Sequence, residues 1–209
     1  MNSCESTPHL FSKKKLLIFD FDGTLADTSL LHAQAFSEIL APQGVKVDYS
    51  KIAGRKTSDA LLFCYSDAGL PEPDAQTLAV LIAEKQQRVR KYIATGLSPL
   101  PGVDEFLRWA KPRFKIALVT SGSSGTVDLA LKKLGYMGWF DPILYAHDVK
   151  VAKPSPEGFL RVLKLTSTTS DEALVFEDSQ VGFKSAIAAN IDFIDARNLD
   201  WSLMKEFFL

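Results

Sequence analysis

Two aspartates, Asp20 and Asp22, follow directly after the apolar run Leu16 to Phe19 and precede Gly23. Side chains two residues apart at the end of a strand point to the same side, so the two carboxylates converge. Carboxylate oxygens are the ligands that a hard divalent cation such as Mg²⁺ prefers. Gly23 permits a sharp turn close to a ligand. This motif predicts an acidic site, and alone it leaves open a solvated acidic turn.

A hydroxyl-rich segment, Thr120-Ser121-Gly122, follows a second apolar run that ends at Val119. Hydroxyls and free backbone amides ahead of a helix form a neutral cradle that suits a phosphate group. The alternative is a simple helix N-cap, the commoner use of Ser and Thr at such positions. We therefore regard Thr120, Ser121 and Gly122 as candidate phosphate-binding residues.

A lysine and an acidic pair supply the remaining charged groups. Lys153 lies in the loop Lys-Pro-Ser-Pro-Glu, where the prolines restrict the backbone. A compact ammonium held there can neutralise a carboxylate and a bound phosphoryl group, although most exposed lysines have no such role. Glu177 and Asp178 follow another apolar run and offer a second source of oxygen ligands for a metal ion.

These groups need a scaffold that brings distant strand ends together. Short apolar runs without alternation predict strands buried on both faces, and the intervening segments have helical periodicity. The predicted strands are 16–19, 114–119, 143–146, 173–176 and, with a weaker pattern, 191–194. Alternating strands and helices predict an α/β fold with a doubly wound parallel sheet. In such sheets ligands bind beyond the carboxyl ends of the strands, where the candidate residues fall.

The interval between the first two strands is too long for one crossover helix, and its pattern is almost entirely helical. The predicted helices are 30–40, 60–68 and 73–95, the last ending at Gly96. We therefore expect an inserted α-helical cap domain over residues 28–96. The core domain then comprises residues 1–27 and 97–209.

The composition excludes several other classes of protein. An apolar share of 46% and a charged share of 23% are typical of a soluble globular chain. The 24 basic and 25 acidic residues nearly balance, so neither nucleic acid nor an anionic membrane is an expected partner. Met1 to Ser12 has no long apolar stretch, so we expect no signal peptide and a cytoplasmic location. Cys4 and Cys64 lack metal-site spacing and are expected to be free thiols.

In order, the motifs around Asp20, Thr120, Lys153 and Glu177-Asp178 resemble the four motifs of the haloacid dehalogenase-like (HAD) superfamily. The resemblance extends from Lys15 to about Ala196. It implies a Rossmann-like core. The helical insertion after the first motif resembles the cap of the subgroup that contains β-phosphoglucomutase and phosphoglycolate phosphatase.

The resemblance implies a role for each matching residue. Asp20 is the nucleophile that forms an aspartyl-phosphate, and Asp22 is the general acid and then the general base. Thr120 binds the phosphoryl oxygens together with the backbone around Gly23, Ser121 and Gly122, and Lys153 offsets their charge. Mg²⁺ is held by Asp20, by the backbone carbonyl of Asp22 and by Asp178, with Glu177 in support.

The expected activity is Mg²⁺-dependent hydrolysis of a small phosphate monoester, such as a sugar phosphate or phosphoglycolate. A hexose-phosphate mutase like β-phosphoglucomutase is the alternative. His32 matches a histidine of the mutase pattern, but related phosphatases often have it too. Dehalogenases lack the carboxylate at the position of Asp22, and receiver-like phosphoacceptors lack both Asp22 and the helical insertion.

Substrate choice is expected to depend on the cap. Arg55 and Lys56 lie in a loop that resembles a substrate-specificity loop, where they could pair with a distal anionic group of the substrate. A solvated basic turn is the alternative, and Thr57 stands where the mutase pattern has arginine. The basic residues Lys85, Arg88, Arg90 and Lys91 are expected to form a solvent face without a role. The expected binding partner is a small phosphorylated metabolite. The protein itself is expected to be a monomer or a dimer.

Overall fold

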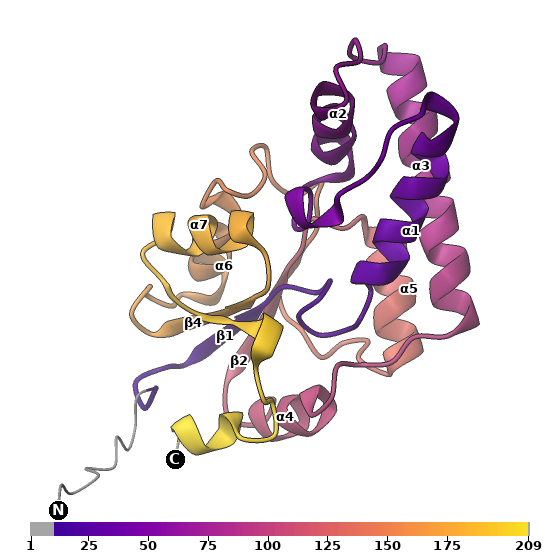
Figure 1. Cartoon of the computed structure of the whole chain (residues 1–209). Coiled ribbons are helices and arrows are strands. Elements are labelled where there is room, and N and C mark those ends of the chain that lie inside the picture. Colours follow the sequence, from indigo (N-terminus) through magenta and orange to yellow (C-terminus); the bar gives the residue numbers. More distant parts are fainter. Residues whose placement is uncertain (1–10, 209) are drawn as a thin grey trace, which may run out of the picture.

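The structure, a computed structural model, describes residues 11–208 and is built on a parallel sheet of five strands in the order β3-β2-β1-β4-β5 (Figure 1). The strands are β1 (Leu16–Phe19), β2 (Lys115–Val119), β3 (Ile143–Leu144), β4 (Ala173–Glu177) and β5 (Asp192–Asp195). The predicted α/β fold with a doubly wound parallel sheet is confirmed. Strand β3 is shorter than predicted, because Tyr145 turns away from the sheet and its amide donates to Asp148. The predictions for Cys4 and for the signal peptide lie outside the described residues.

Helices cover both faces of the sheet because alternate side chains of each buried strand point to opposite sides. Leu17 and Phe19 of β1 belong to the apolar cluster under helices α4 and α5, whereas Leu16 and Ile18 belong to the cluster under α6 and α7. The core helices are α4 (Val103–Ala110), α5 (Ser124–Leu134), α6 (Glu157–Thr166) and α7 (Gln180–Ala188). Phe19 stacks on Phe176 of β4 with ring centroids 4.8 Å apart. Burial of such a ring contributes roughly 2 kcal/mol.

The register of the central strands sets the position of the strand ends. Phe19 pairs with Leu118 on one side and with Phe176 on the other, so the three strands finish at the same level. The amide of Asp20 donates to the carbonyl of Phe176 at 2.9 Å. Strand order reverses at β1, with β2 on one side and β4 on the other. This is the switch point at which doubly wound sheets bind their ligands.

The segment between β1 and β2 is helical and has an apolar cluster of its own, which includes Phe36, Leu61 and Leu81. Its elements are α1 (Ser29–Leu40), the 3₁₀ helices η1 (Ala41–Gln43) and η2 (Tyr49–Lys51), α2 (Thr57–Asp67) and α3 (Ala75–Thr95). We call this segment the cap. Asp74 begins α3 by accepting a hydrogen bond from the amide of Thr77 at 2.7 Å.

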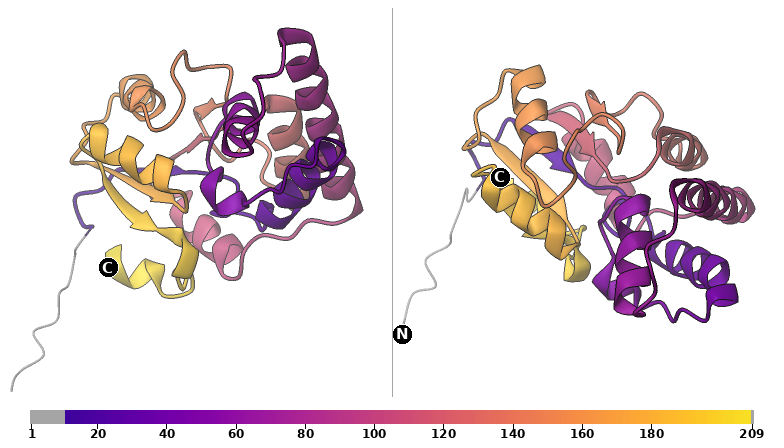
Figure 2. Two further views of the ribbon diagram at one scale, coloured as in Figure 1. Left: turned by 45° about the horizontal axis from the view of Figure 1, so that its top comes forward. Right: turned by 90° about the horizontal axis from the view of Figure 1, so that it is seen from above.

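Helix α3 is the cap helix that packs against a helix of the core. Figure 2 shows α1, α2 and α3, coloured indigo to magenta, grouped at one side of the molecule. Helix α3 packs against α1 within the cap and against α5 of the core, where Lys133 donates to the carbonyl of Ala94. The domain boundaries at 27/28 and 96/97 stay a prediction. Within residues 11–208, no helix is both long and apolar enough to cross a bilayer.

The last elements cover the sheet face that α4 and α5 also cover. The 3₁₀ helices η3 (Ala196–Asn198) and η4 (Met204–Phe208) follow β5. Trp201 and Met204 are buried in the cluster that contains Phe19. The C-terminal residues therefore contribute to the core that supports β1, the strand that carries Asp20.

Candidate active site

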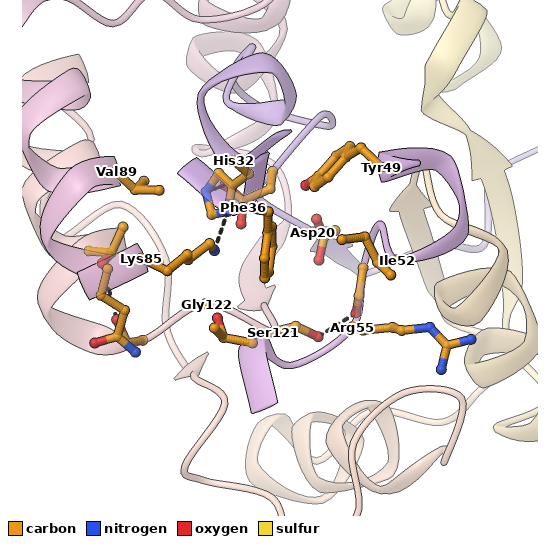
Figure 3. Close-up of a pocket in the computed structure, with 16 residues that line it drawn as sticks. Asp20, His32, Phe36, Tyr49, Ile52, Arg55, Lys85, Val89, Ser121 and Gly122 are labelled. Atoms are coloured by element: carbon orange, nitrogen blue, oxygen red, sulfur yellow. Dashed lines mark hydrogen bonds and ion pairs between the residues drawn. The ribbon is translucent and has the colours of Figure 1, made fainter. Parts of the chain in front are cut away.

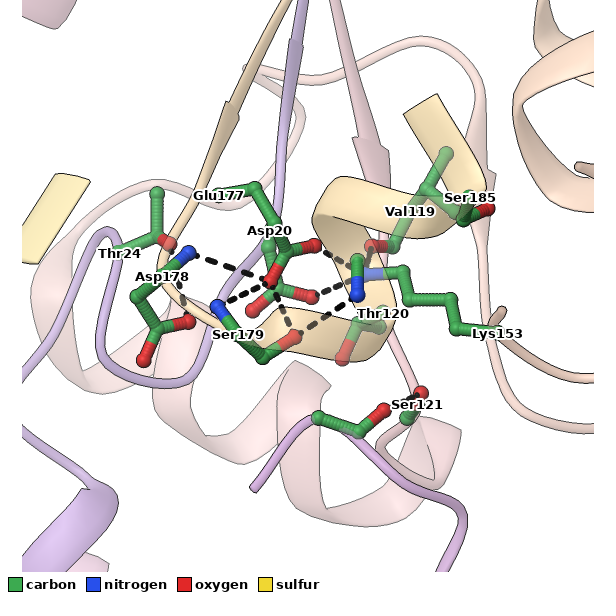
Figure 4. Close-up of polar contacts among 12 residues, drawn as sticks. Asp20, Thr24, Val119, Thr120, Ser121, Lys153, Glu177, Asp178, Ser179 and Ser185 are labelled. Atoms are coloured by element: carbon green, nitrogen blue, oxygen red, sulfur yellow. Dashed lines mark hydrogen bonds and ion pairs between the residues drawn. The ribbon is translucent and has the colours of Figure 1, made fainter. Parts of the chain in front are cut away.

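Three carboxylates meet at the ends of β1 and β4. Asp20 follows β1, Glu177 ends β4 and Asp178 comes next in the chain. Each offers one oxygen atom, and these atoms lie within 4.8 Å of one another. Figure 4 shows the three side chains gathered beside the N-terminus of α7. The structure therefore brings together the acidic residues that the sequence placed some 150 positions apart.

Lys153 lies between two of these carboxylates. Its ammonium donates to Asp20 Oδ1 at 2.6 Å, to Glu177 Oε2 at 2.7 Å and to the carbonyl of Val119 at 3.1 Å (Figure 4). A lysine has three donors, so all of them are used. Burial lowers the pKa of Lys153, but Asp20 and Glu177 outweigh this effect and the net pKa is raised. Lys153 is therefore a permanent positive charge at the site.

Glu177 is completely buried and anchors its surroundings. While Oε2 accepts from Lys153, Oε1 accepts from the amide and the hydroxyl of Ser179 at 3.0 and 2.7 Å, and from the amide of Asp178. A Cβ atom at Gly182 would lie 1.9 Å from the carboxyl carbon of Glu177, so only glycine fits in this turn of α7. Both oxygens of Glu177 are thus engaged within the protein, which suits a supporting role.

The crowding of carboxylates makes their ionised forms unfavourable in the protein alone. Burial, followed by the charge of Glu177, raises the pKa of Asp20 well above its usual value, although Lys153 opposes the shift. The same two causes raise the pKa of Asp178 to about 7. A divalent cation would remove this penalty because it supplies two positive charges to oxygen ligands. The residues present therefore fit a Mg²⁺ ion held by Asp20 and Asp178.

Asp22 lies on the other side of Asp20, in a turn that depends on Gly23. Gly23 has φ +81°, and a Cβ atom there would lie 2.2 Å from Asp178 Oδ2. Asp22 Oδ1 accepts from the hydroxyl of Thr28 at 2.5 Å and lies 3.2 Å from His32 Nε2. Burial raises the pKa of Asp22, but His32 and Thr28 outweigh it and hold this pKa below its ordinary value. Asp22 is therefore ionised in the resting site.

His32 connects Asp22 to a lysine of the cap. Its Nδ1 lies 2.7 Å from the ammonium of Lys85 and accepts this hydrogen bond (Figure 3). Nε2 then carries the ring proton and lies 3.2 Å from Asp22 Oδ1. Burial and the charge of Lys85 lower the pKa of His32, which makes it neutral near pH 7. Burial also lowers the pKa of Lys85, to about 8.

The prediction that Lys85 belongs to a solvent face is wrong. Lys85 is 4% exposed, and its ammonium also lies 4.6 Å from the ring centroid of Phe36. The buried residues of α3 are Leu81, Lys85, Val89 and Ile93. Their spacing of four residues marks Lys85 as part of the apolar stripe, a signal that the sequence contained. Arg88 and Lys91 are on the predicted outer side; Lys91 is exposed and Arg88 pairs with Glu84.

The hydroxyl-rich segment follows β2 beside Asp20. Thr120 is buried, and its Oγ1 accepts from the amide of Gly122 at 2.9 Å. The hydroxyl of Ser121 donates to the carbonyl of Gly54 in the cap at 2.6 Å. The segment thus lies between the core and the cap, although binding of phosphate by Thr120, Ser121 and Gly122 stays a prediction.

The two cations of the cap loop have protein partners. The guanidinium of Arg55 lies 4.9 Å from the ring centroid of Phe63, and its Nε donates to the carbonyl of Lys51. The ammonium of Lys56 donates to the carbonyl of Val149 in the core at 3.1 Å. Their proposed contact with a distal anion of the substrate therefore stays a prediction. What the structure adds is that Lys56 joins the cap to the core.

A pocket lies between these core and cap residues, and Figure 3 shows its walls. Asp20, Asp22 and Ser121 to Ser123 contribute from the core, while Phe36, Tyr49 and Ile52 contribute from the cap. Tyr49 and Lys85 were not among the predicted site residues. The fold and the site together define an α/β enzyme with an acidic centre covered by a helical insertion.

Comparison with known proteins identifies the family. The sequence model described as haloacid dehalogenase-like hydrolase matches residues 17–196, and the chain belongs to this family. The Escherichia coli fructose-1-phosphate phosphatase YqaB is 32% identical over 183 residues, which cover 88% of this chain and 96% of the relative. The phosphorylated carbohydrates phosphatase of Thermotoga maritima is 29% identical over 182 residues, with 85% and 82% covered.

Solved structures support the same fold. CbbY from Rhodobacter sphaeroides, solved in complex with phosphate, has a TM-score of 0.76 and 25% identity, with 87% of this chain and 85% of that chain covered. A β-phosphoglucomutase from Clostridium difficile has a TM-score of 0.81 and 22% identity over 93% and 97% of the two chains. At that level of identity the second likeness concerns the fold alone. The predicted family is confirmed by the match of the family model over residues 17–196.

Proposed function

We propose that this protein is a Mg²⁺-dependent phosphatase that hydrolyses a small phosphorylated sugar through a phosphoryl group carried by Asp20. The observation that carries this proposal is the buried ammonium of Lys153 between Asp20 and Glu177, with Asp178 beside them and Asp22 two residues away. The names of the relatives, a fructose-1-phosphate phosphatase and a phosphorylated carbohydrates phosphatase, support a sugar phosphate as substrate.

The first half of the reaction transfers the phosphoryl group to Asp20. A carboxylate oxygen of Asp20 forms a bond to phosphorus while the bond between phosphorus and the ester oxygen breaks. The leaving oxygen takes a proton from Asp22 and departs as the free sugar hydroxyl. A carboxylate is a weak nucleophile towards an anionic phosphate, so this step needs the fixed charge of Lys153 and the amides around Ser121 and Gly122.

Asp22 must carry a proton for that step, although its pKa is low in the resting site. A phosphate dianion placed beside it raises the pKa, because a nearby negative charge disfavours the ionised carboxylate. In the second half, Asp22 accepts a proton from a water molecule whose oxygen attacks phosphorus. The bond between phosphorus and Asp20 then breaks, and inorganic phosphate is released.

Mg²⁺ would be held by Asp20 and Asp178, with Glu177 fixing the loop that presents Asp178. When bound, the ion offsets the negative charge of the carboxylates and of the phosphoryl oxygens. The hydroxyl of Thr24 lies 3.4 Å from Asp178 Oδ1 and helps to orient that carboxylate. The protein itself supplies the nucleophile, the proton donor and the pocket between core and cap.

The test is the release of inorganic phosphate from sugar monophosphates, phosphoglycolate, nucleotides and p-nitrophenyl phosphate, with Mg²⁺ and with a chelator. We expect turnover that requires Mg²⁺ and is fastest with a sugar monophosphate. Interconversion of hexose phosphates that depends on a bisphosphate primer, with negligible free phosphate, would instead identify a mutase. Transfer of one phosphoryl group to each protein molecule without turnover would contradict both the phosphatase and the mutase activity.

A further inference from the structure

Tyr49 is a cap residue that reaches the acidic centre. It begins η2 and lines the same pocket as Asp20 and Asp22. In Figure 3 its ring lies above Asp20, and the hydroxyl end points into the space between Asp20 and His32. No motif singles out this residue, since a lone tyrosine in a cap segment has many structural uses.

The backbone holds Tyr49 firmly in this position. Asp48 accepts hydrogen bonds from the amide and the hydroxyl of Ser50 at 3.1 and 2.7 Å, which fixes the start of η2. The carbonyl of Tyr49 accepts from the amides of Ile52 and Ala53 at 3.0 and 2.9 Å. The ring packs near Phe36 with centroids 6.5 Å apart. The direction of the hydroxyl is therefore set by the cap fold.

The surroundings of the hydroxyl indicate what it can bind. Burial raises the pKa of Tyr49 well above its usual value, and the charges of Asp22, Asp178 and Asp20 raise it further. The phenol therefore stays protonated and is a donor. Among residues 11–208, no protein hydrogen bond is formed by this hydroxyl. A donor that lines the same pocket as Asp20 and Asp22, yet bonds to neither of them, is placed to contact the group that reacts there.

We propose that Tyr49 binds the substrate, its hydroxyl donating a hydrogen bond from the cap to an oxygen of the phosphoryl group being transferred. This inference rests on the proposed function and deepens it, because it gives the cap a direct contact with the reacting group. Its neighbours Phe36 and Ile52 are apolar, and two other cap donors that line the pocket already have partners, Lys85 in His32 and Arg55 in the carbonyl of Lys51. A hydrogen bond to a charged oxygen is stronger than one between neutral groups.

The experiment compares Tyr49→Phe with the wild-type protein, using fructose 1-phosphate, p-nitrophenyl phosphate and the inhibitor orthovanadate. We expect kcat/KM to fall about tenfold or more for both substrates, and the inhibition constant of orthovanadate to rise by a similar factor. The matched control is Tyr92→Phe, which removes a cap hydroxyl that bonds to Glu38 on the surface. The control should keep wild-type kinetics.

The outcomes separate this inference from the proposed function. If the wild-type protein releases phosphate but Tyr49→Phe matches it on both substrates and on orthovanadate, only the role of Tyr49 is overturned. Loss with fructose 1-phosphate alone would also overturn it, since the contact would then be to the sugar. A merely structural role would lower the unfolding temperature of Tyr49→Phe without changing orthovanadate inhibition. If the wild-type protein has no activity, both proposals fall.

Discussion

Lys153 in the core and Lys85 in the cap are both buried lysines that line the active site, yet their surroundings differ. Lys153 donates to two carboxylates and one carbonyl, and its pKa is raised. Among the residues that the structure describes, Lys85 has a single hydrogen-bond partner, the neutral ring of His32, and burial lowers its pKa to about 8. The same side chain is thus a permanent charge in one region and a titratable group in the other.

The difference reflects how each region is connected. Lys153 is held by residues from the ends of β1, β2 and β4, whose positions are fixed by continuous strand pairing. Lys85 meets His32 because two cap helices, α1 and α3, pack together beside the core. The core therefore supplies a constant electrostatic centre, while the cap contributes groups whose charge and position depend on how it packs.

The largest effect is expected at the centre itself. Asp20→Asn replaces the proposed nucleophile with a carboxamide that cannot attack phosphorus, so kcat should fall by at least about a thousandfold. The unfolding temperature should stay close to that of the wild-type protein, because the change removes one of several crowded carboxylates. Phosphate release and thermal unfolding measure the two quantities. Substantial residual turnover would reject Asp20 as the nucleophile.

The same substitution at the two lysines tests the comparison directly. Lys153→Met leaves Asp20 and Glu177 buried without their cation, so it should lower the free energy of unfolding by about 3–5 kcal/mol. Lys85→Met removes a buried cation that forms no ion pair with a described carboxylate. Its free energy of unfolding should therefore lie within about 1 kcal/mol of the wild-type value or exceed it. Urea unfolding of both variants, without added metal, gives the values. Equal losses at the two positions would contradict the difference between the regions.

Gly182 tests how tightly the core is packed around Glu177. Gly182→Ala forces a methyl group against a carboxylate that is fixed by four hydrogen bonds, and should cost about 2–3 kcal/mol of stability. The matched control is Gly125→Ala in α5, where a Cβ atom meets nothing within 4 Å. The free energy of unfolding of that variant should rise by up to about 1 kcal/mol, since alanine favours a helix. A Gly182→Ala protein as stable as this control would show that Glu177 can move.

The smallest effect is a dependence of metal binding on pH. The pKa of Asp178 is raised to about 7, so its protonated form favours folding, and this contribution is lost as pH rises from about 4 to about 7. Mg²⁺ binds the ionised form of Asp178 and so restores the stability that is lost when the proton leaves. The rise in unfolding temperature on adding Mg²⁺ should therefore be larger at about pH 8 than at about pH 5. Asp178→Asn should reduce the rise, and an equal rise at both values would contradict a site at Asp178.

The core could be predicted from the sequence because strand ends are marked by local patterns. Asp20, Thr120 and Asp178 each follow a strand directly, and parallel pairing brings such strand ends to one edge of the sheet. Strands β1, β2 and β4 were predicted within one residue, and Asp20, Lys153 and Asp178 do meet. The hydrogen bonds of Glu177 and the constraint at Gly182 could not be predicted, since they depend on the depth at which α7 packs.

The cap was harder to predict because its contacts depend on the rotation of helices and on packing between segments. Charge alone assigned Lys85 to the surface, although its spacing from Leu81 and Val89 pointed inwards. Arg55 and Lys56 have partners in Phe63 and Val149 that no local pattern reveals. Tyr49 reaches the pocket only through the path of η2. Its position could be known only from the three-dimensional structure.

The length of chain between the residues that meet at the acidic centre has a consequence for biosynthesis. Asp20 and Lys153 are 133 residues apart, and Thr24 and Asp178 are 154 apart. A ribosome that has completed β1, the helical insertion and β2 has made Asp20, but it has not yet made Lys153 or the acidic pair Glu177 and Asp178. Newly made protein therefore gains this acidic centre only when β4 emerges and pairs with β1. Fragments released before that point would have an exposed aspartate and no means of phosphoryl transfer.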